Sequence, residues 1–583
     1  MQRKWMIGIS IVALSYLLTG TISAQNGQPS EQDPRRPLGI YAKVSISDDI
    51  AALKNAGSPT TREALNDYFN NLYMEMLGNQ AISGLTVVVH WDTVNPNPPG
   101  AKHDYDWRYV DDAFYQVKLW NENRSQNEAP KTIQLIVTPG FQSPQWVLDN
   151  LQSCDGLFLD SVVEQFPPHD CGKVTFLGFS EEADHTELPI PWNPYYKDAW
   201  HKFLKALADR YGSRTEFVSI AVAGPTASSE EMIVPNDNNS PLQTQFGAFT
   251  PNDVWLWLLN WGYPTQPAYW DSDQAFIDEW NAAIDMYGTV FPGVTLIATT
   301  GSGLPSFSTT GFTIPSAFKD DCKNLTMDCA AEATILSYFS ESTTDPLSAK
   351  ASQTSGLEAA RTGDPDLGLA GVKHLSLQTA SLTDPAAQIL GGAQFNTSFS
   401  DSTFHILKEG CTSTFPPDAG DKPKGCHIPS SCNPQINSAA CLPVACIPQA
   451  CLAPGITTED FTADITFGNV PADKLIPREQ AEYNVLLDFF KKTPGSSVFG
   501  GAPGDAPLNY MQVYSNDIEY ANCHVGDTAE VLESGGTTWV SADTLLITAS
   551  QTLMGIAEPN PVSPALPGPP EGTTNCPVAQ PST

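Results

Sequence analysis

Short, almost fully apolar runs alternate with amphipathic stretches through the first half of the chain, and this alternation restricts the fold more than any other feature. The amphipathic stretches place apolar residues three and four positions apart, which indicates helices. Strands are predicted at 38–45, 85–90, 132–140, 218–223 and 293–303, and helices at 61–77, 107–123, 195–212 and 272–288. The order is therefore strand, helix, strand, helix.

The predicted strands are apolar throughout rather than at every second residue, which indicates parallel pairing with both faces of the sheet covered. Further candidates at 370–378, 387–395 and 507–515 bring the number of strands to about eight. This number suits an α/β fold of the closed (β/α)₈ type, the TIM barrel. An open doubly wound sheet is the alternative, but no glycine-rich phosphate loop follows any of these strands.

The sequence divides into a barrel and several segments of different character. Residues 1–24 combine Arg3 and Lys4 with a short apolar run, as secretory signal peptides do. Residues 25–36 form a linker, 37–403 and 468–555 the two parts of the barrel, and 556–583 a proline-rich tail. Residues 404–467 lack periodicity and are expected to form a disulfide-stapled insertion, or a small binding module, outside the barrel. Because residues 1–24 resemble a signal peptide, the chain is expected to be secreted or periplasmic.

All 12 cysteines follow the predicted cleavage site, and an even number in an exported chain favours disulfides. Metal binding is the alternative, but no CxxC pair and no HExxH motif is present. Local disulfides are expected for Cys154 with Cys171 and for Cys322 with Cys329. The six cysteines from Cys411 to Cys451 are expected to pair among themselves, which leaves Cys523 for Cys576. Neither a metal nor another cofactor is expected.

The charge of the chain restricts its partners. Lys and Arg number 30 against 65 Asp and Glu, which gives a net charge of −35. Such a surface repels phosphate backbones and anionic lipid, which argues against nucleic-acid and membrane-surface partners. After the leader, no apolar run is long enough to span a membrane. A neutral ligand fits these properties, and the sequence does not indicate an oligomeric state.

In a parallel barrel the ligand site lies at the carboxyl ends of the strands. The residues that the predicted strands bring there include carboxylates, amides and aromatic groups, which are the groups that bind carbohydrates. The candidates for substrate contact are His90, Trp91, Asp92, Trp146, Tyr514 and Asn516. Each has a structural alternative: His90 and the two tryptophans are also typical core residues, and Asp92 is also a turn cap.

Glu230 and Glu231 stand just beyond the fourth predicted strand, after the Gly224-Pro225 turn. Glycoside hydrolysis needs two carboxyl groups across the scissile bond, one to protonate the leaving oxygen and one to attack or to activate water. We expect Glu231 to be the proton donor, with Glu230 as the substitute. Solvated loop acids are the alternative interpretation.

Two stretches resemble the (β/α)₈ glycoside hydrolases of the β-galactosidase-like, clan A type. They are "VVVHWDTVNPNPPGAKHDYDWRYVDDAF" at the second strand and "LIVTPGFQSPQWVL" at the third, and the resemblance covers about residues 38–305. It implies an acid/base residue after the fourth strand, which carries over to Glu231 or Glu230. This chain has Ser229 before Glu230, where the family has the asparagine of an Asn-Glu pair.

The family places its nucleophile after the seventh strand, where the candidate strand 387–395 contains Gln394 and no acid. Glu341 and Asp517 are the substitutes that the composition offers. Asp517 is also a candidate helix N-cap.

The sequence favours a secreted glycoside hydrolase that cleaves O-glycosidic bonds in a neutral poly- or oligosaccharide. The alternative is a non-catalytic carbohydrate-binding or surface-interaction protein on a degenerate barrel. A serine hydrolase is disfavoured because no GxSxG motif is present. The sugar, the linkage and the stereochemical outcome are not indicated.

Overall fold

The computed structural model describes the barrel region in most detail. The residues it describes are 36–125, 128–156, 171–177, 187–237, 243–244, 249–262, 273–305, 331–332, 334–336, 338–339, 348–351, 374–378, 508–515, 518–519, 522, 528–533, 536–541, 546–547, 550–551 and 553–554. The predicted signal peptide, the cysteine-rich segment 404–467, the tail and the candidate strand 387–395 lie outside these residues.

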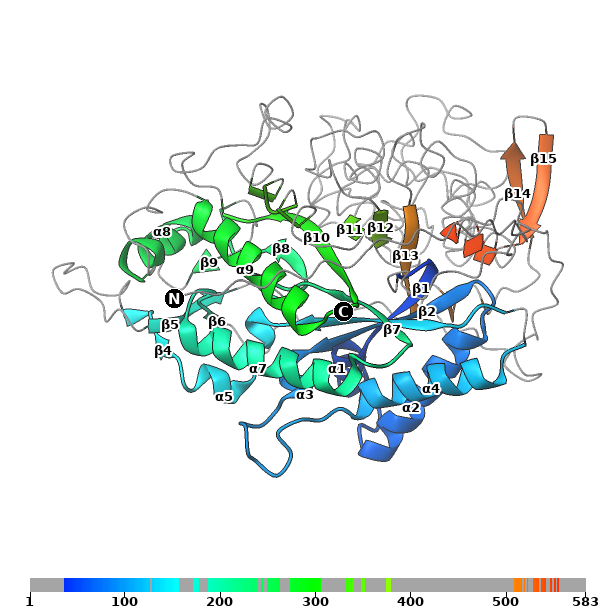
Figure 1. The fold of residues 1–583 in the computed structure, drawn as a ribbon, viewed down its shortest axis with the longest axis horizontal. Helices are drawn as coiled ribbons and strands as arrows, with labels where there is room; N and C mark the ends of the chain where they lie inside the picture. Colours follow the sequence, from blue (N-terminus) through cyan, green and yellow to red (C-terminus); the bar gives the residue numbers. More distant parts are fainter. Residues whose placement is uncertain are drawn as a thin grey trace, which may run out of the picture. The chain divides into compact units, whose positions relative to one another are not determined.

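Eight parallel strands pair in a ring (Figure 1). They are β1 (Gly39–Ser45), β2 (Ile82–His90), β3 (Thr132–Thr138), β7 (Phe217–Ala221), β10 (Thr295–Gly303), β11 (Ser348–Ala351), β12 (His374–Gln378) and β13 (Leu508–Tyr514). Each pairs with the next in this order, and β13 pairs with β1. A ninth strand, β8 (Glu231–Ile233), pairs with the carboxyl half of β10. The predicted parallel sheet is confirmed.

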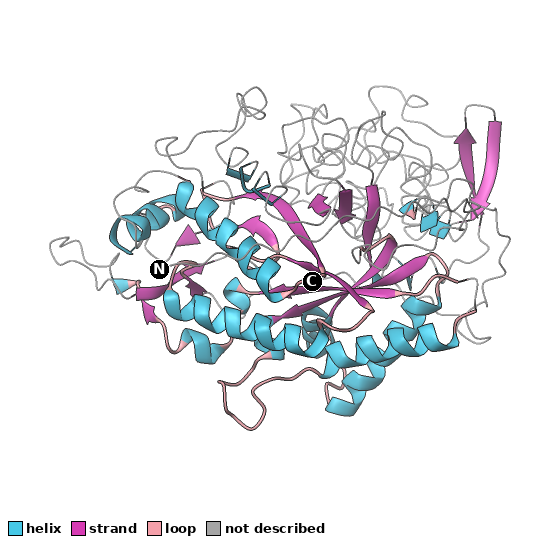
Figure 2. Ribbon diagram, viewed as in Figure 1, coloured by secondary structure: helices cyan, strands magenta, loops and turns pink. Residues whose placement is uncertain are grey.

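Helices follow the strands in the part of the chain where both are described (Figure 2). The longer ones are α1 (Ile46–Asn55), α2 (Arg62–Gly78), α4 (Arg108–Asn123), α7 (Pro194–Tyr211), α8 (Pro251–Gly262) and α9 (Gln274–Val290). Short helical turns are α3 (Trp91–Val94), η1 (Gly140–Gln142) and α5 (Gln145–Leu148). The four predicted helices are confirmed, whereas the segments that link β10 to β13 lie mostly outside the description. A complete (β/α)₈ pattern therefore stays a prediction.

Local sequence signals explain where two of these helices begin. The Thr61 side chain accepts a hydrogen bond from the Ala64 amide at 3.3 Å at the start of α2. The Asn193 side chain accepts from the amides of Tyr195 and Tyr196, and Pro194 occupies the first turn of α7. Both caps satisfy amides that have no partner within the helix.

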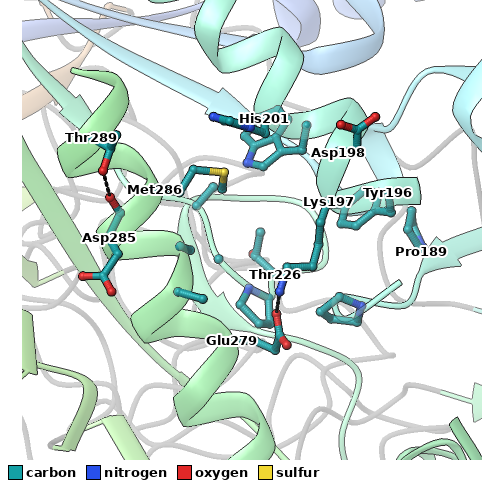
Figure 3. Close-up of a pocket in the computed structure, with 17 residues that line it drawn as sticks. Pro189, Tyr196, Lys197, Asp198, His201, Thr226, Glu279, Asp285, Met286 and Thr289 are labelled. Carbon is teal, nitrogen blue, oxygen red and sulfur yellow. Dashed lines mark hydrogen bonds and ion pairs between the residues drawn. The ribbon is translucent and has the colours of Figure 1, made fainter. Parts of the chain in front are cut away.

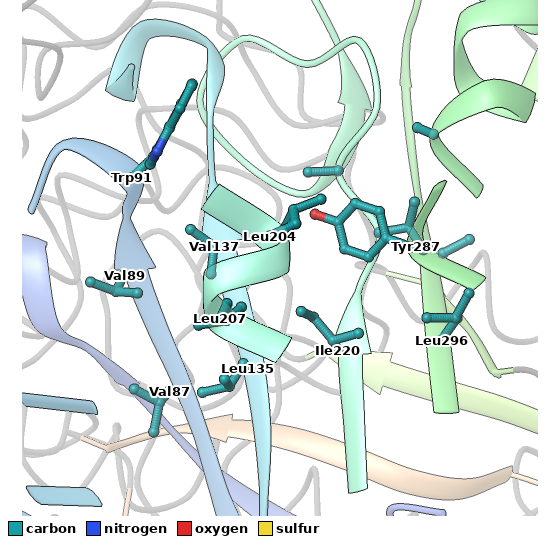
Figure 4. Close-up of a cluster of buried hydrophobic side chains, with 14 of the residues drawn as sticks. Val87, Val89, Trp91, Leu135, Val137, Leu204, Leu207, Ile220, Tyr287 and Leu296 are labelled. Carbon is teal, nitrogen blue, oxygen red and sulfur yellow. The ribbon is translucent and has the colours of Figure 1, made fainter. Parts of the chain in front are cut away.

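The outer face of the sheet forms the main hydrophobic core. Residues that alternate along β2 and β3, such as Val87, Val89, Leu135 and Val137, are buried against the helices (Figure 4). Leu204 and Leu207 of α7 belong to the same cluster. Burial of each such side chain contributes about 1.5–3 kcal/mol, which makes this contact the main source of stability for the sheet and its helices.

The inner face of the ring carries a different set of side chains. A buried polar network joins Thr86, Gln134, Tyr510 and Gln512, with hydrogen bonds of 2.5 to 3.1 Å. Val88, Ile136 and Ala221 form a small apolar cluster separate from the outer core. The inside of the ring is therefore filled with side chains, and functional groups are expected at its rim.

Several small elements were not predicted. Strands β4 (Gln152–Ser153), β5 (Cys171–Leu177), β6 (Glu187–Pro189) and β9 (Gln243–Thr244) form a minor sheet. A hairpin pairs β14 (Thr528–Glu533) with β15 (Gly536–Ser541). The expected disulfide between Cys154 and Cys171 is confirmed and ties the minor sheet together. The other ten cysteines lie outside the described residues. Within the described helices, none is long and apolar enough to cross a membrane.

Candidate functional site at the carboxyl rim of the strands

Successive side chains of a strand point to opposite faces, so the inward set can be followed to the rim. Tyr41, Val88, Ile136, Ile297 and Tyr510 form the two inner clusters. The inward positions nearest the carboxyl ends of the same strands, two to four residues further on, are Lys43, His90, Thr138, Thr299 and Tyr514. Five strands therefore direct a polar or aromatic side chain toward the same rim.

Lys43 is the cation of this rim. Its side chain is buried, its Nζ donates to the Tyr514 hydroxyl at 3.3 Å, and it lies 4.7 Å from the centre of the Tyr514 ring. Burial acts to lower the pKa of Lys43, but Tyr514, Glu230 and Glu231 outweigh it and the pKa is raised. Lys43 is therefore a buried ammonium held by groups from both β13 and the loop that follows β7.

Glu230 and Glu231 follow β7 in the chain, beyond the carboxyl end of that strand. Glu230 is 4% exposed, and both carboxyls are close enough to Lys43 to raise its pKa. Glu231 is partly exposed and begins β8, where it pairs in register with Thr299 of β10. The strand itself ends at Ala221, two residues before the predicted end. The two carboxyls thus differ in exposure, and both act on the pKa of Lys43 through coulombic attraction.

The loop between Ala221 and Glu231 is held in place by its backbone. The Ala227 amide donates to the Ile233 carbonyl at 2.7 Å, and the Ala227 carbonyl accepts from the Phe141 amide at 2.5 Å. Gly140 permits this approach: its φ is 74°, and a Cβ there would lie 2.1 Å from the Ala227 carbonyl oxygen. The loop therefore gives the two glutamates a fixed base.

An imidazole and a carboxylate lie close together just beyond β1 and at the end of β2. His90 Nε2 is 3.3 Å from Asp48 Oδ1, and the Ser45 hydroxyl donates to the other carboxylate oxygen. Burial acts to raise the pKa of Asp48, but His90, Ser45 and Lys43 outweigh it and the pKa is lowered. Asp48 is thus an ionised carboxylate that orients His90.

Two hydroxyls on the inner face have no hydrogen-bond partner among the described residues. Thr138 Oγ1 and Thr299 Oγ1 are both buried and unpaired. Thr138 lies beside His90 in register, and Thr299 lies beside Glu231. Buried polar groups are normally paired, so these two hydroxyls are exceptions among the described residues.

The structure places the predicted substrate contacts in different surroundings. His90 and Tyr514 lie at the rim with Lys43. Trp91 is fully buried in the outer core, where its ring meets Trp200 at 4.9 Å, so its position favours packing over sugar contact. Trp146 is partly buried and donates to the Asn95 carbonyl at 2.9 Å, and Asp92 accepts from the Thr93 hydroxyl. Asn516, Asp517 and Glu341 lie outside the described residues.

The seventh strand of the ring is β12, which ends at Gln378. The candidate strand 387–395 was expected in that place because β11, with the sequence Ser-Ala-Lys-Ala, is too short and too polar to be recognised from the sequence. Neither stretch contains an acid, so the family's nucleophile position has no counterpart in β12.

Lys43 is the residue that sequence reasoning missed. The sequence did contain a signal for this residue, because Lys43 is the only charged residue in a strand that is apolar or small at its other positions. It also shares the inward face with Tyr41. Within the described residues, no group of three or more histidine, cysteine or acidic side chains is arranged to hold a metal ion.

No protein-family model matches the chain, and no curated protein matches it. Among solved structures it is similar to the β-galactosidase from the psychrophilic Marinomonas ef1, with 12% identity, a TM-score of 0.28, and 60% of this chain and 48% of that one covered. The catalytic domain of β-amylase from Paenibacillus polymyxa gives 11% identity, a TM-score of 0.28 and coverages of 59% and 86%. The chain thus spans about half the length of that β-galactosidase.

Proposed function

We propose that this chain is a secreted glycoside hydrolase that cleaves O-glycosidic bonds in a neutral poly- or oligosaccharide. The observation that carries the proposal is the rim itself. A buried glutamate, a partly exposed glutamate and a buried ammonium lie together at the carboxyl end of a parallel ring, beside two unpaired hydroxyls. Carboxylates supply the acid and base chemistry, and hydroxyl, phenol and imidazole groups supply hydrogen bonds to sugar hydroxyls.

Glu231 is assigned as the proton donor, with Glu230 as its carboxyl neighbour. A donor must reach the glycosidic oxygen, and Glu231 is the more exposed of the two. Glu230 is the adjacent carboxyl, and a neighbouring carboxylate favours the protonated form that a donor needs.

The second carboxyl group is assigned to Asp517. It follows β13 in the sequence, and β13 lies four strands from β7 in either direction around the ring. Asp517 is therefore the acid that comes soonest after the strand opposite β7 in the ring. Glu341 precedes β11 in the sequence rather than following a strand, so Asp517 is preferred.

The test measures the release of reducing sugar from a panel of neutral polysaccharides and aryl glycosides. Wild-type protein is compared with Glu231→Gln, Asp517→Asn and the control Asp209→Asn, which removes an exposed carboxylate on α7. The proposal expects turnover to fall about 10²–10⁴-fold in the first two variants and to stay unchanged in the control. Sugar binding, measured by calorimetry, should survive in Glu231→Gln.

A non-catalytic carbohydrate-binding protein is the second candidate, and the charge balance around Lys43 favours it over other classes. In a non-catalytic protein, the ammonium of Lys43 would offset the negative charge of Glu230 and stabilise the fold without taking part in a reaction. This candidate predicts that wild-type protein binds sugars from the panel but releases no product, and that Glu231→Gln binds them equally well.

A further inference from the structure

Asp48 and His90 form a polar pair that takes no part in the proposed acid and base chemistry. Asp48 stands in the first turn of α1, which begins directly after β1, and His90 is the last residue of β2. His90 Nε2 and Asp48 Oδ1 are 3.3 Å apart. The Asp48 side chain is 45% exposed and the His90 side chain is 17% exposed, so a ligand at the rim can reach both.

Other contacts join the two turns that carry this pair. The Ser47 hydroxyl accepts from the His90 backbone amide at 3.0 Å and lies 2.9 Å from the Thr93 hydroxyl. The turns after β1 and β2 are therefore held together without the side-chain contact between His90 and Asp48. This leaves both exposed side chains available for a ligand.

The chemistry of Asp48 selects hydrogen-bond donors. Burial acts to raise the pKa of Asp48, but hydrogen bonds from His90 and Ser45 and the charge of Lys43 outweigh it and the pKa is lowered. An ionised carboxylate can accept about four hydrogen bonds, and the described residues supply two, from His90 and Ser45. The ammonium of Lys43 disfavours a cation at the same place. Neutral donors such as sugar hydroxyls therefore fit the remaining acceptor positions.

Lys43 also connects this pair to the candidate acids. Its charge acts on the pKa of Asp48, and both Glu230 and Glu231 act on the pKa of Lys43. Such effects weaken with distance, so the three carboxyls lie on the same part of the rim. A sugar ring held by Asp48 would therefore lie beside the proposed proton donor.

A cavity of about 520 Å³ between α7 and α9 is less suited to a sugar (Figure 3). Its walls are mostly proline, alanine, glycine, methionine and aromatic side chains, and none of the rim residues described above lines it. Lys197 Nζ is paired there with Glu279 Oε2 at 2.6 Å. The rim therefore offers the better match to a molecule with many hydroxyl groups.

We propose that Asp48 binds the substrate directly, by accepting hydrogen bonds from two adjacent hydroxyl groups of a sugar ring. The two oxygens of one carboxylate suit two neighbouring hydroxyls, and His90 is the positioning residue that fixes the carboxylate. The substrate is then a neutral glycan whose bound ring carries these two hydroxyls without a methyl, acetyl or glycosyl substituent. This assignment rests on the proposed function, because it takes the ligand to be a sugar.

The test uses para-nitrophenyl glucosides, galactosides and mannosides, intact and with one ring hydroxyl removed at a time. With wild-type protein, removal of either bound hydroxyl should lower kcat/KM about 10- to 100-fold, as expected for a hydrogen bond to a charged group. Asp48→Ala should lower kcat/KM of the intact glycoside to a similar extent, mainly through KM. Removal of the same hydroxyl should then cost this variant little more, because the contact is already lost.

Variants of His90 separate positioning from packing. His90→Gln keeps an N–H for the carboxylate and should retain most of the dependence on the bound hydroxyls, whereas His90→Ala should lose most of it. Asp209→Ala, which removes an exposed carboxylate on α7, should behave as wild-type protein. Thermal unfolding shows that each variant is folded. Equal behaviour of the two His90 variants would overturn its positioning role.

The contact itself is overturned if removal of each hydroxyl costs Asp48→Ala as much as it costs wild-type protein. Calorimetry with the same glycosides separates this outcome from failure of the proposed function. Binding without release of nitrophenol refutes the hydrolase, and dissociation constants then replace kcat/KM in the comparison of Asp48→Ala with wild-type protein. A wild-type protein that neither binds nor cleaves any of the glycosides refutes both.

Discussion

The ammonium of Lys43 donates to the hydroxyl of Tyr514 at 3.3 Å, which joins the first and last strands of the ring across 471 residues of sequence. The same ammonium interacts with Glu230 and Glu231 beyond β7. One buried cation therefore links both sides of the rim, and the arrangement of the candidate site depends on it.

Replacement of Lys43 by methionine should destabilise the protein. It removes the hydrogen bond from the ammonium to the Tyr514 hydroxyl and the coulombic attraction to Glu230, so the loss should be about 1.5–3 kcal/mol. The double variant Lys43→Met/Glu230→Gln removes both charges and should lose less stability than Lys43→Met alone. Urea unfolding of the two single variants and the double variant measures the coupling. Strictly additive losses would contradict the proposed interaction.

Two acids with raised pKa values, Asp49 at the start of α1 and Glu519 after β13, should make the protein less stable as the pH rises. Burial, together with Asp48 and Glu519, raises the pKa of Asp49 to about 8, and burial together with Glu75 raises the pKa of Glu519 to about 7. A carboxyl with a raised pKa binds more protons when folded than when unfolded, so stability falls between about pH 4 and pH 8. Asp49→Asn should flatten that decline in urea unfolding at pH 5, 6.5 and 8, the range in which both groups titrate.

Asp67→Asn is the matched control for this pH dependence, because Asp67 is exposed on α2. It should leave the decline as steep as in wild-type protein. A decline that persists unchanged in Asp49→Asn would show that other groups cause it.

Gly224 should not tolerate a side chain. A Cβ there would lie 2.5 Å from the Trp280 ring, so Gly224→Ala forces the loop or the ring to move. Overpacking of this kind costs about 1–3 kcal/mol. Gly288→Ala on α9 meets nothing within 4 Å and should be neutral or stabilising by about 0.5–1 kcal/mol. Thermal unfolding separates the two, and equal effects would show that the loop is not packed as described.

Removal of the Cys154–Cys171 disulfide should lower stability by about 3 kcal/mol. The bond closes a loop of 17 residues, and constraint of the unfolded chain accounts for a loss of this size. The double variant Cys154→Ser/Cys171→Ser is compared with wild-type protein by guanidinium unfolding. An unchanged midpoint would mean that the minor sheet does not contribute to the cooperative unit.

The strands and helices that bury a continuous apolar face could be predicted from the sequence. The helix at 195–212 combines an N-terminal cap with apolar residues at helical spacing, and such local signals do not need tertiary context. Strand β11 could not be found, because Ser-Ala-Lys-Ala has no apolar pattern and gains its conformation from pairing with β10 and β12.

The candidate site was predictable to a smaller extent. Glu230 and Glu231 could be placed at the rim because they follow a buried strand. The role of Trp91 could not be derived, because a tryptophan beside a strand end suits both a sugar platform and a core, and its neighbours come from α7 more than 100 residues later. Lys43 required knowledge of which face of β1 turns inward.

The most direct test of Glu231 as the proton donor compares two leaving groups. In Glu231→Ala, turnover of a natural oligosaccharide should fall about 10²–10⁴-fold, because its sugar leaving group needs a proton. The kcat/KM of the matching dinitrophenyl glycoside, which reports the bond-cleavage step, should change little, because dinitrophenolate leaves without a proton. An equal loss on both substrates, or no loss on either, would contradict the assignment of Glu231.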